Sequence, residues 1–512
     1  MRSSKHGLKE IVVYAFMVAA MVSALFLPVN SALSEDMPKQ PAQTEAEVGS
    51  VTAIVKDEVE PARYGSSDEV EIRWQSHFPE HPELYVSMPF PEPTEPVAGT
   101  EPESRYISYN LITGEETTSD IAYEDSAVAG WIKGGMAARA KSLPGEIEEE
   151  QVQPLNFCDL FQISNPEDYP WCVNCKLYMT FPGPAYYVAS GVLIDPLHVL
   201  TAGHCVHEGS GGNWATSIVV VPGYENGVRP YGDASAVQLH SWTGWTQNEQ
   251  WDHDMGIIDL DRPVGALTGW HGYGYNNDCS FFTSSSNTFN NPGYPAASPY
   301  NGQYMYNWNG YFDNCYTYLL RFNKQAYGGQ SGSGVYYIHS GPNRVVYAEL
   351  SSGTSTWTQD ARITSTKFGH IGDVIDADTP STFDLISLDV NTSPATITAG
   401  DQLSSMNYVV HNYSSASWSG TVNVNVYLST NDNISTSDTL IQSHYFSYSF
   451  GAKKSVRVNM STPPTILAGT SEGDYWIGVI LDISDYNTGN NDSDEQDASP
   501  IHVIPPCGNM SV

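Results

Sequence analysis

Short apolar runs separated by turns are the feature that most restricts how this chain can fold. Val, Ile, Tyr and Leu are concentrated at residues 187–194, 335–338, 422–429 and 475–482. Such side chains favour strands, and the Gly, Asn, Asp and Pro residues between the runs favour turns. Long patterns of helical periodicity are scarce, so the sequence predicts a mostly β protein. With 512 residues, the chain is long enough for more than one domain.

The chain is strongly acidic. It contains 58 Asp and Glu residues against 22 Lys and Arg residues, which gives a formal net charge of −36. Nucleic acids and anionic membranes would repel such a surface because they carry negative charge themselves. The composition therefore argues against both as partners, and it favours a soluble protein.

The first 34 residues have the pattern of an export signal. Arg2, Lys5 and Lys9 precede an apolar run at residues 11–27, and the small residues Ala32 and Ser34 follow it. This order predicts a secretory signal peptide over residues 1–34, cleaved after Ser34, and hence a secreted protein with no membrane contact after cleavage. The apolar run is also long enough for an uncleaved membrane anchor, which is the alternative.

Residues 35–150 are rich in Pro and Glu. This composition is typical of a poorly packed or exposed segment and not of a core. A short helical patch is expected over residues 127–141, and the acidic run at residues 146–150 would be an accessible processing site. We interpret residues 35–150 as a removable acidic pro-region. An acidic linker or a small accessory domain is the alternative.

The seven cysteines are Cys158, Cys172, Cys175, Cys205, Cys279, Cys315 and Cys507. In an exported protein most should be paired, and the odd count leaves one free or intermolecular. Cys279 and Cys315 are the expected bridge, and Cys205 is expected to pair with one of the first three. The C-x-x-C at Cys172 and Cys175 lacks the βαβ context of a redox motif, and a single such pair is too little for a zinc site.

Three segments carry the residue types of nucleophilic catalysis. Ser331 lies among four glycines before a predicted strand, and glycines allow a turn whose N–H groups face the hydroxyl. A serine hydroxyl needs a neighbouring base, and His204 ends an apolar run beside a cysteine. Asp254 precedes the apolar residues 255–258. Asp252 and Asp259 are the alternatives to Asp254, as solvated carboxylates.

These segments resemble the motifs of trypsin-like serine proteases. The histidine motif matches Leu200-Thr201-Ala202-Gly203-His204-Cys205, the aspartate motif matches Asp254-Met255-Gly256-Ile257-Ile258, and the serine motif matches Gly329-Gln330-Ser331-Gly332-Ser333. The order His, Asp, Ser agrees with the family. The resemblance covers roughly residues 175–372 and implies two consecutive β-barrels with the active site between them.

The resemblance also implies a role for each residue. Ser331 would attack the peptide carbonyl, His204 would accept its proton, and Asp254 would orient the imidazole. The backbone N–H groups of Gly329 and Ser331 would form the oxyanion hole. Trypsin-like zymogens carry an Asp immediately before the serine, where this chain has Gln330. We therefore expect removal of the pro-region to unblock the cleft without a buried ammonium–carboxylate pair.

The specificity pocket differs from those of known branches. Residues 291–295, 327–333 and 361–364 look most like the bacterial glutamyl-endopeptidase branch. That branch carries a His and a Thr or Ser at pocket positions where this chain has Leu350 and Ala326. Trypsin has an Asp at the pocket base, where this chain has Gln325. Neither Leu350 nor Ala326 can pair with a carboxylate, and Gln325 cannot neutralise a cation, so an apolar or small substrate side chain is expected.

Residues 383–505 form a separate predicted module. Its alternating runs and regular turns are typical of a β-sandwich. Short segments such as Phe383-Asp384-Leu385 and Gly473-Asp474-Tyr475-Trp476 resemble CARDB-type Ig-like modules of secreted bacterial proteins. Such a module would bind substrate or a cell surface, or serve as a spacer. Its acidic turns offer calcium ligands, but solvated turns are the commoner explanation, so no metal or cofactor is predicted.

The whole pattern predicts a serine endopeptidase acting on proteins or peptides, with its protease domain at residues 151–375. One rival is a secreted binding or adhesion protein whose protease-like domain is inactive. Another is an esterase that uses the same three residues. An α/β-hydrolase is disfavoured because its triad runs Ser, Asp, His along the chain and needs βαβ units.

Overall fold

The computed structural model describes residues 51–56, 77–88, 105–119, 129–135, 157–183, 185–339 and 343–506. Residues 48–512 belong to one compact unit. Strands dominate the described part of the chain and helices are few, which confirms the mostly β prediction. No helix in these ranges is long and apolar enough to cross a membrane. The predicted signal peptide, the site at residues 146–150 and Cys507 lie outside the described residues.

Six antiparallel strands close the first barrel of the protease domain. The pairing order is β10-β7-β8-β9-β12-β11, and β11 pairs with β10 again to complete the ring. The strands are β7 (Asn174–Phe181), β8 (Ala185–Asp195), β9 (His198–Thr201), β10 (Ser217–Pro222), β11 (Ala234–Trp242) and β12 (Gly256–Leu260). Strand β8 reads as predicted, with a continuous buried run at its C-terminal end.

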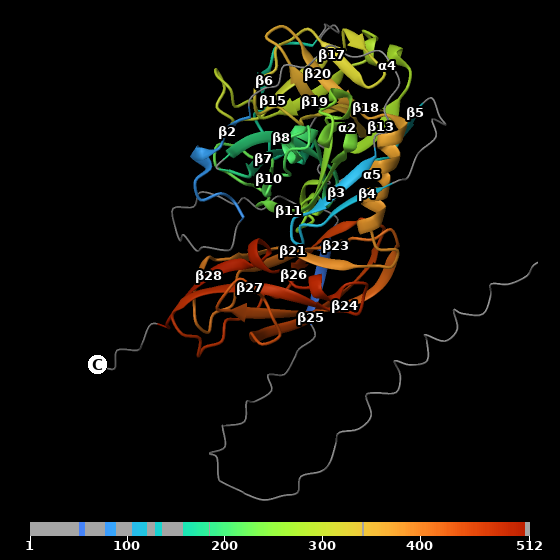
Figure 1. Cartoon of the computed structure of the whole chain (residues 1–512). Helices are drawn as coiled ribbons and strands as arrows, with labels where there is room; N and C mark the ends of the chain where they lie inside the picture. Colours follow the sequence, from blue (N-terminus) through green and yellow to red (C-terminus); the bar gives the residue numbers. More distant parts are fainter. Residues whose placement is uncertain are drawn as a thin grey trace, which may run out of the picture. The chain divides into compact units, whose positions relative to one another are not determined.

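Strands from the acidic N-terminal region extend both sheets of the protease domain. Strand β3 (Tyr106–Asn110) pairs with β11 on one side and with β4 (Glu116–Ser119) on the other, as Figure 1 shows. Strand β2 (Val86–Ser87) pairs in parallel with β8. Ile107 is only 2% exposed within the barrel core. The expectation that residues 35–150 contain no core is therefore wrong at this position, because a distant strand supplies the apolar partners that local composition lacks.

In its described part, residues 129–135, the helical patch expected over residues 127–141 contains a short strand and no helix. Strand β5 (Ala129–Trp131) pairs antiparallel with β13 (Gly272–Asn276). A Cβ atom on Gly130 would lie 2.8 Å from the ring of Tyr275, so glycine permits the close approach of the two strands. Pairing with a distant strand thus overrides the local helical pattern.

The second sheet of the protease domain is barrel-like and has an aromatic core. Its main path is β16-β17-β20-β19-β18-β14-β15-β6, and β13 joins it by pairing with β19. The core contains Phe157, Phe282, Phe289 and Phe322. The strands are β6 (Phe161–Gln162), β14 (Phe289–Gly293), β15 (Tyr306–Gly310), β16 (Asn314–Cys315), β17 (Leu319–Phe322), β18 (Gly334–Ile338), β19 (Arg344–Gly353) and β20 (Thr358–Arg362).

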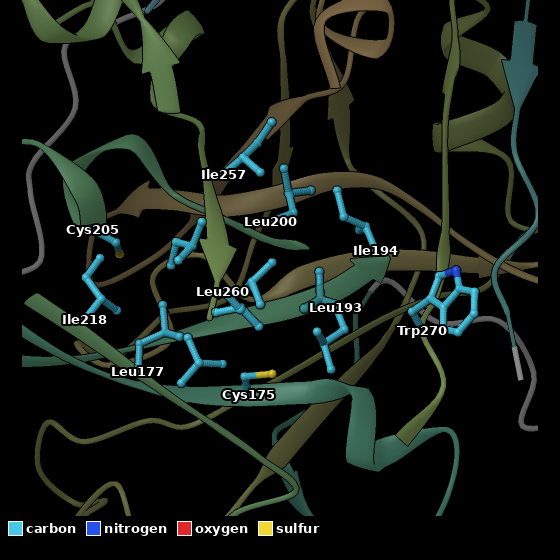
Figure 2. Packing of buried hydrophobic residues seen from close by; sticks show 14 of the residues in the cluster. Cys175, Leu177, Leu193, Ile194, Leu200, Cys205, Ile218, Ile257, Leu260 and Trp270 are labelled. Atoms are coloured by element: carbon cyan, nitrogen blue, oxygen red, sulfur yellow. The ribbon is translucent and has the colours of Figure 1, made fainter. Parts of the chain in front are cut away.

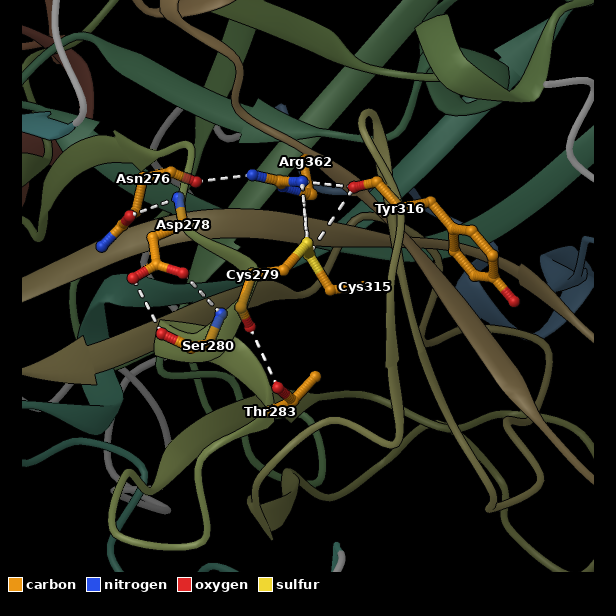
Figure 3. Close-up of a disulfide and its surroundings, with 8 residues drawn as sticks. All are labelled: Asn276, Asp278, Cys279, Ser280, Thr283, Cys315, Tyr316 and Arg362. Carbon is orange, nitrogen blue, oxygen red and sulfur yellow. Dashed lines mark hydrogen bonds between the residues drawn. A yellow bond between two sulfur atoms is a disulfide. The ribbon is translucent and has the colours of Figure 1, made fainter.

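The predicted disulfide between Cys279 and Cys315 is present at the edge of this sheet. It joins strand β16 to helix α4 (Cys279–Thr283), whose first turn is capped by the Asp278 carboxylate through the N–H of Ser280 at 2.9 Å. The Arg362 guanidinium lies against Cys315 Sγ at 3.4 Å and donates to the carbonyl of Asn276 (Figure 3). The bridge therefore fastens a segment that also packs into the aromatic core through Phe282.

The expected pairing of Cys205 is not found. Cys205 is fully buried and forms no disulfide with Cys158, Cys172 or Cys175. Figure 2 shows Cys175 and Cys205 among the aliphatic side chains of the first barrel core. Buried thiols of this kind pack as small apolar side chains, so the core accommodates them without a covalent bond.

Two layers of strands form the C-terminal module around one apolar core. One layer contains β21 (Leu385–Ser393), β23 (Ser405–Asn412) and β26 (Ser455–Met460). The other contains β22 (Thr396–Thr398), β24 (Trp418–Ser429), β25 (Thr439–Phe450), β27 (Gly473–Asp482) and β28 (Ser499–Ile504). Strand β1 (Val51–Lys56) pairs with β25 and β26 and so connects the layers. Val422, Val424 and Val426 alternate into the core, as the period-2 pattern predicts.

The longest helix, α5 (Ser365–Asp378), leads from the second sheet to the C-terminal module. Thr364 caps it by accepting the N–H of Lys367 at 3.2 Å. The predicted end of the protease domain at residue 375 therefore falls in the last turn of this helix. The remaining helices are short: α1 (Gly203–Val206), α2 (Thr243–Thr246), α3 (Gly265–Thr268) and 3-10 turns at Pro82–Leu84, Trp171–Val173, Trp251–His253, Thr488–Asn490 and Glu495–Asp497.

Buried contacts join the C-terminal module to the first barrel. Ile386 and Leu388 of β21 belong to the same apolar cluster as the barrel core. Arg262 makes a two-pronged ion pair with Asp497, at 2.7 and 2.6 Å. The amide of Gln496 donates to the carboxylate of Asp233 at 3.1 Å. The interface thus combines apolar burial with directional polar contacts.

Candidate active site

His204 and Asp254 lie in contact at the end of the first barrel, on two different segments of the chain. Strand β9 leads into α1, which carries His204, and Asp254 lies between the Trp251–His253 turn and β12. A Cβ atom on Gly203 would lie 3.0 Å from Asp254 Oδ1 and 2.9 Å from the backbone nitrogen of Met255. Glycine before the histidine therefore allows the carboxylate to approach the backbone of α1.

Three hydrogen bonds hold the Asp254 carboxylate. The backbone N–H of His204 donates to Oδ1 at 2.7 Å, and His204 Nδ1 lies 2.9 Å from Oδ2. The hydroxyl of Ser351 donates to Oδ2 at 2.6 Å. Asp254 is 0% exposed, so these bonds replace the water that a free carboxylate would bind. The arrangement fixes both the position and the tautomer of the imidazole.

The environment of His204 changes its basicity. Burial lowers the pKa of the imidazole, but the neighbouring Asp254 carboxylate outweighs burial and holds the pKa well above the ordinary 6.5. Its Nε2 atom is buried and has no hydrogen-bond partner, so no hydrogen bond joins it to Ser331. The ring of Trp245 packs edge-on against the imidazole, with centroids 6.2 Å apart. His204 is therefore oriented on its Nδ1 side and unpaired at Nε2.

The loop of Ser331 is attached to both sheets of the protease domain. The N–H of Ser190 on β8 donates to the carbonyl of Ser331 at 2.8 Å, and the N–H of Gly332 donates to the carbonyl of Leu350 on β19 at 2.7 Å. A Cβ atom on Gly332 would lie 2.1 Å from Thr201 Oγ1, three residues before His204. Because the loop touches the end of β9, it lies beside the segment that carries the histidine.

The conformation of the loop requires its glycines. Gly329 has φ = 100° and Gly332 has φ = 81°, values that favour glycine. Gln330 is tied inside the loop, where its side-chain oxygen accepts the N–H of Tyr327 at 2.9 Å. Within the described residues, no backbone acceptor is found for the N–H of Gly329 or of Ser331. These two donors are thus available to a bound group.

The three predicted pocket residues are not equally placed. Ala326 and Leu350 are buried in the aromatic core of the second sheet, at 4% and 0% exposure, whereas Gln325 is exposed. Leu350 lies opposite Asp360 on the neighbouring strand β20. Neither oxygen of the buried Asp360 carboxylate has a hydrogen-bond partner, and burial raises its pKa well above the ordinary value. A buried carboxyl group without a hydrogen-bond partner therefore lies beside the leucine.

Sequence reasoning missed Ser351 and Glu349. Ser351 is the third partner of Asp254, and Glu349 is a fully buried carboxyl whose two oxygens have no hydrogen-bond partner. Burial and the charge of Asp254 raise the pKa of Glu349 well above its usual range. The only sequence signal was their place on the strand after the serine loop, because the contact with Asp254 joins segments far apart in the chain.

A segment of the acidic N-terminal region lies against the serine loop. A Cβ atom on Gly328 would meet the carbonyl oxygen of Met88 at 2.9 Å and Ser87 Cβ at 3.0 Å. The pairing of β2 with β8 places this segment there, with Ser87 opposite Val188. Residues 87–88 therefore contact the glycine immediately before Gly329.

Comparison with known proteins identifies the family. A family model described as Trypsin matches residues 162–284, a range that includes His204 and Asp254. An extracellular metalloprotease of Bacillus subtilis (strain 168) is 30% identical over 246 residues, which cover 46% of this chain and 77% of that protein. A glutamyl endopeptidase of Bacillus licheniformis is 31% identical over 220 residues, covering 42% of this chain and 66% of that protein.

This chain belongs to the trypsin-like serine protease family, and a glutamyl endopeptidase is among its relatives. Two solved structures are also similar. A Glu endopeptidase in complex with MPD is 20% identical with a TM-score of 0.36, covering 42% of this chain and 95% of that one. The protease Anisep from Arthrobacter nicotinovorans is 24% identical with a TM-score of 0.36, covering 41% and 96%.

Proposed function

We propose that the protein is a serine endopeptidase that hydrolyses peptide bonds through an acyl-enzyme. The observation that carries this proposal is the 2.9 Å contact between His204 Nδ1 and Asp254 Oδ2, which leaves Nε2 for proton transfer. Ser331 Oγ attacks the peptide carbonyl, and His204 Nε2 takes its proton and later gives it to the leaving amine. Asp254 stabilises the imidazolium that forms between these steps.

The oxyanion hole would consist of the backbone N–H groups of Gly329 and Ser331. Each donor aimed at the developing negative charge contributes on the order of 3 kcal/mol to stabilisation of the transition state. The positive φ of Gly329 supports this assignment, because it turns the peptide plane in a way that few other residues adopt.

Metal-dependent hydrolysis is the other candidate reaction, since the Bacillus subtilis relative is named a metalloprotease. In the described part of the chain, one group of side chains has ligand atoms close enough to share an ion, and it consists of His198, Asp259 and Asp378. That group contains neither His204 nor Asp254, whose ring nitrogen and carboxylate are already bonded to each other. We therefore assign peptide hydrolysis to Ser331.

For the cleaved bond, we propose a preference for an apolar or small side chain before it. Leu350 and Ala326 offer no hydrogen bond to a substrate carboxylate, and both belong to an apolar cluster. The relationship to a glutamyl endopeptidase favours glutamate instead, so the two expectations give different digestion products.

We propose that the protein is exported as a precursor. In this scheme the N-terminal region, up to a cut near residues 146–150, restricts access to the site until it is removed. The contact of Met88 and Ser87 with Gly328 supports the scheme, because it places chain from that region beside the oxyanion donors. The C-terminal module would be Ig-like and would bind substrate or a cell surface; its two-layered core supports that architecture.

A peptide-library digestion read by mass spectrometry tests the function. The Ser331→Ala protein should lose on the order of a millionfold in turnover, whereas Asp252→Asn should keep its activity because Asp252 is not the proposed orienting carboxylate. Apolar residues before the cut bond would support the pocket assignment, and a glutamate consensus would refute it. If neither parent nor Ser331→Ala protein cleaves peptides after the N-terminal region has been removed, the inactive binding protein is the better description.

A further inference from the structure

A second constellation of ionisable side chains lies away from the proposed catalytic residues, at the other end of strand β9. His198 begins β9 and lies opposite Asp259 of β12 in the sheet register. Asp378 is the last residue of helix α5. One nitrogen or oxygen atom from each of the three side chains lies within 4.8 Å of the other two. Potential ligands from β9, β12 and α5 therefore lie close together.

The hydrogen-bonding pattern leaves one ligand atom available on each buried residue. His198 is 0% exposed, and its Nδ1 lies 3.0 Å from the carboxylate of Asp195. Its Nε2 has no hydrogen-bond partner and is directed at the carboxylates of Asp259 and Asp378. Oδ2 of Asp259 lies 2.6 Å from His240 Nε2, and its buried Oδ1 has no hydrogen-bond partner. Metal-binding histidines are held in this way, with a carboxylate on the other ring nitrogen.

The spacing of the ligand atoms suits a small divalent cation. His198 Nε2 lies 3.3 Å from Asp378 Oδ2 and 3.6 Å from Asp259 Oδ1. Zinc binds imidazole nitrogen and carboxylate oxygen at about 2.0–2.2 Å in tetrahedral geometry, which separates neighbouring ligand atoms by about 3.4 Å. These two separations lie on either side of that value, and the third, between the Asp259 and Asp378 oxygens, is no more than 4.8 Å, so a cation fits among the three ligand atoms.

The local charge also favours a cation. Asp195, Asp259 and Asp378 are close to His198, whereas the ammonium that faces them is Lys453 of the C-terminal module, which pairs with Asp195. Three carboxylates against one ammonium leave an excess of two negative charges, which either an imidazolium at His198 or a bound cation must offset. Because buried charge is costly unless it is compensated, a dication would balance this group.

We propose that His198, Asp259 and Asp378 form a structural binding site for a divalent cation of the zinc type. Asp378 also lines a cavity of about 500 Å³, together with Leu197 and Tyr413, and water from that cavity would supply the fourth ligand. The ion would connect two strands of the first barrel with the end of α5. Tyr413 and Lys453 bring the C-terminal module to the same place, since both contact Asp195.

Isothermal titration of the full chain with zinc chloride tests this proposal. The Ser331→Ala background prevents self-digestion, and the protein is first treated with a chelator and dialysed. Asp378 is 44% exposed at its side chain, so Asp378→Asn should fold while losing one charged ligand. Asp376→Asn is the matched control, because Asp376 is an exposed residue in the last turn of the same helix.

One zinc ion per chain is the expected result, with binding weakened at least about tenfold in Asp378→Asn and unchanged in Asp376→Asn. Saturating zinc should also raise the melting temperature of the parent by roughly 3–5 °C and have little effect on Asp378→Asn. No binding, or binding of equal strength in all three proteins, would overturn the proposal. In that case His198 is a buried ion-pair partner of the carboxylates and holds no metal.

Discussion

Removing the guanidinium of Arg262 should strongly destabilise the whole protein. Arg262 lies in the protease domain, and its two bonds to Asp497 at 2.7 and 2.6 Å cross to the C-terminal module. The two side chains are 10% and 7% exposed, so they are shielded from water and salt. Leaving a buried carboxylate without its partner costs about 3–5 kcal/mol. Arg262→Ala should therefore lower the free energy of unfolding by about 3–5 kcal/mol. The same substitution removes the hydrogen bond that the Arg262 guanidinium donates to the carbonyl of Tyr231 at 2.7 Å.

The assay is urea unfolding followed by tryptophan fluorescence, again on the Ser331→Ala background. A cycle of Arg262→Ala, Asp497→Ala and the double variant should give a coupling energy of about 2 kcal/mol. Lys324→Ala is the control, because its pair with Asp159 is exposed and should change stability by less than about 0.5 kcal/mol. If Arg262→Ala unfolds like the control, or if the two single changes are additive, the ion pair does not stabilise the interface and the reasoning fails.

The remaining predictions concern the site and its surroundings. Asp254→Asn should lower kcat about 10⁴-fold, since an amide favours the wrong imidazole tautomer; steady-state kinetics measure this. The pKa of His204 lies above 6.5, and only the neutral imidazole accepts a proton, so kcat/KM should rise with pH through an inflection above 6.5. An inflection below 6.5 would contradict the assignment of His204 as the general base. Burial raises the pKa of Asp360, so the folded state retains a proton that the unfolded state loses above pH 3.8. The free energy of unfolding should therefore fall as the pH rises from 3.8 toward the pKa of Asp360 in the folded state. Asp360→Asn should reduce that fall, as measured by urea unfolding midpoints from about pH 4 to 8. Replacing Cys279 and Cys315 by serine opens a loop of 36 residues and should cost about 4 kcal/mol in the same assay; an unchanged midpoint would show that other contacts hold the loop.

The contact between His204 and Asp254 was easier to anticipate from the sequence than the contacts around it. His204 and Asp254 each lie in a motif that local spacing defines, and the structure brings them within 2.9 Å. Ser351 carries no such signal, because its contact with Asp254 depends on how the second sheet meets the first. The buried acid Asp360 was overlooked for the same reason. Its burial follows from the register of β20 against β19, which a single sequence does not encode locally.

Composition was misleading for the N-terminal region. Residues 35–150 are rich in Pro and Glu, and that composition is typical of a segment without a core. Ile107 is nevertheless buried, because its strand β3 pairs with β11, where Ser241 lies opposite Ile107 and is more than a hundred residues away in the chain. The cluster of His198, Asp259 and Asp378 escaped notice in the same way, since a strand start, a strand interior and a helix end share no sequence pattern. Non-local pairing explains all of these omissions.

The attachment of strand β3 to the first barrel has a consequence for maturation. The proposed cut near residues 146–150 would break one covalent connection and would leave a ladder of five residue pairs between β3 and β11 intact. The severed piece would then be a ligand of the protease domain, held at a high effective concentration only until it first dissociates. Dilution or a second cleavage would thereafter decide how much of it stays bound. Maturation would thus be governed by mass action as well as by the cut itself.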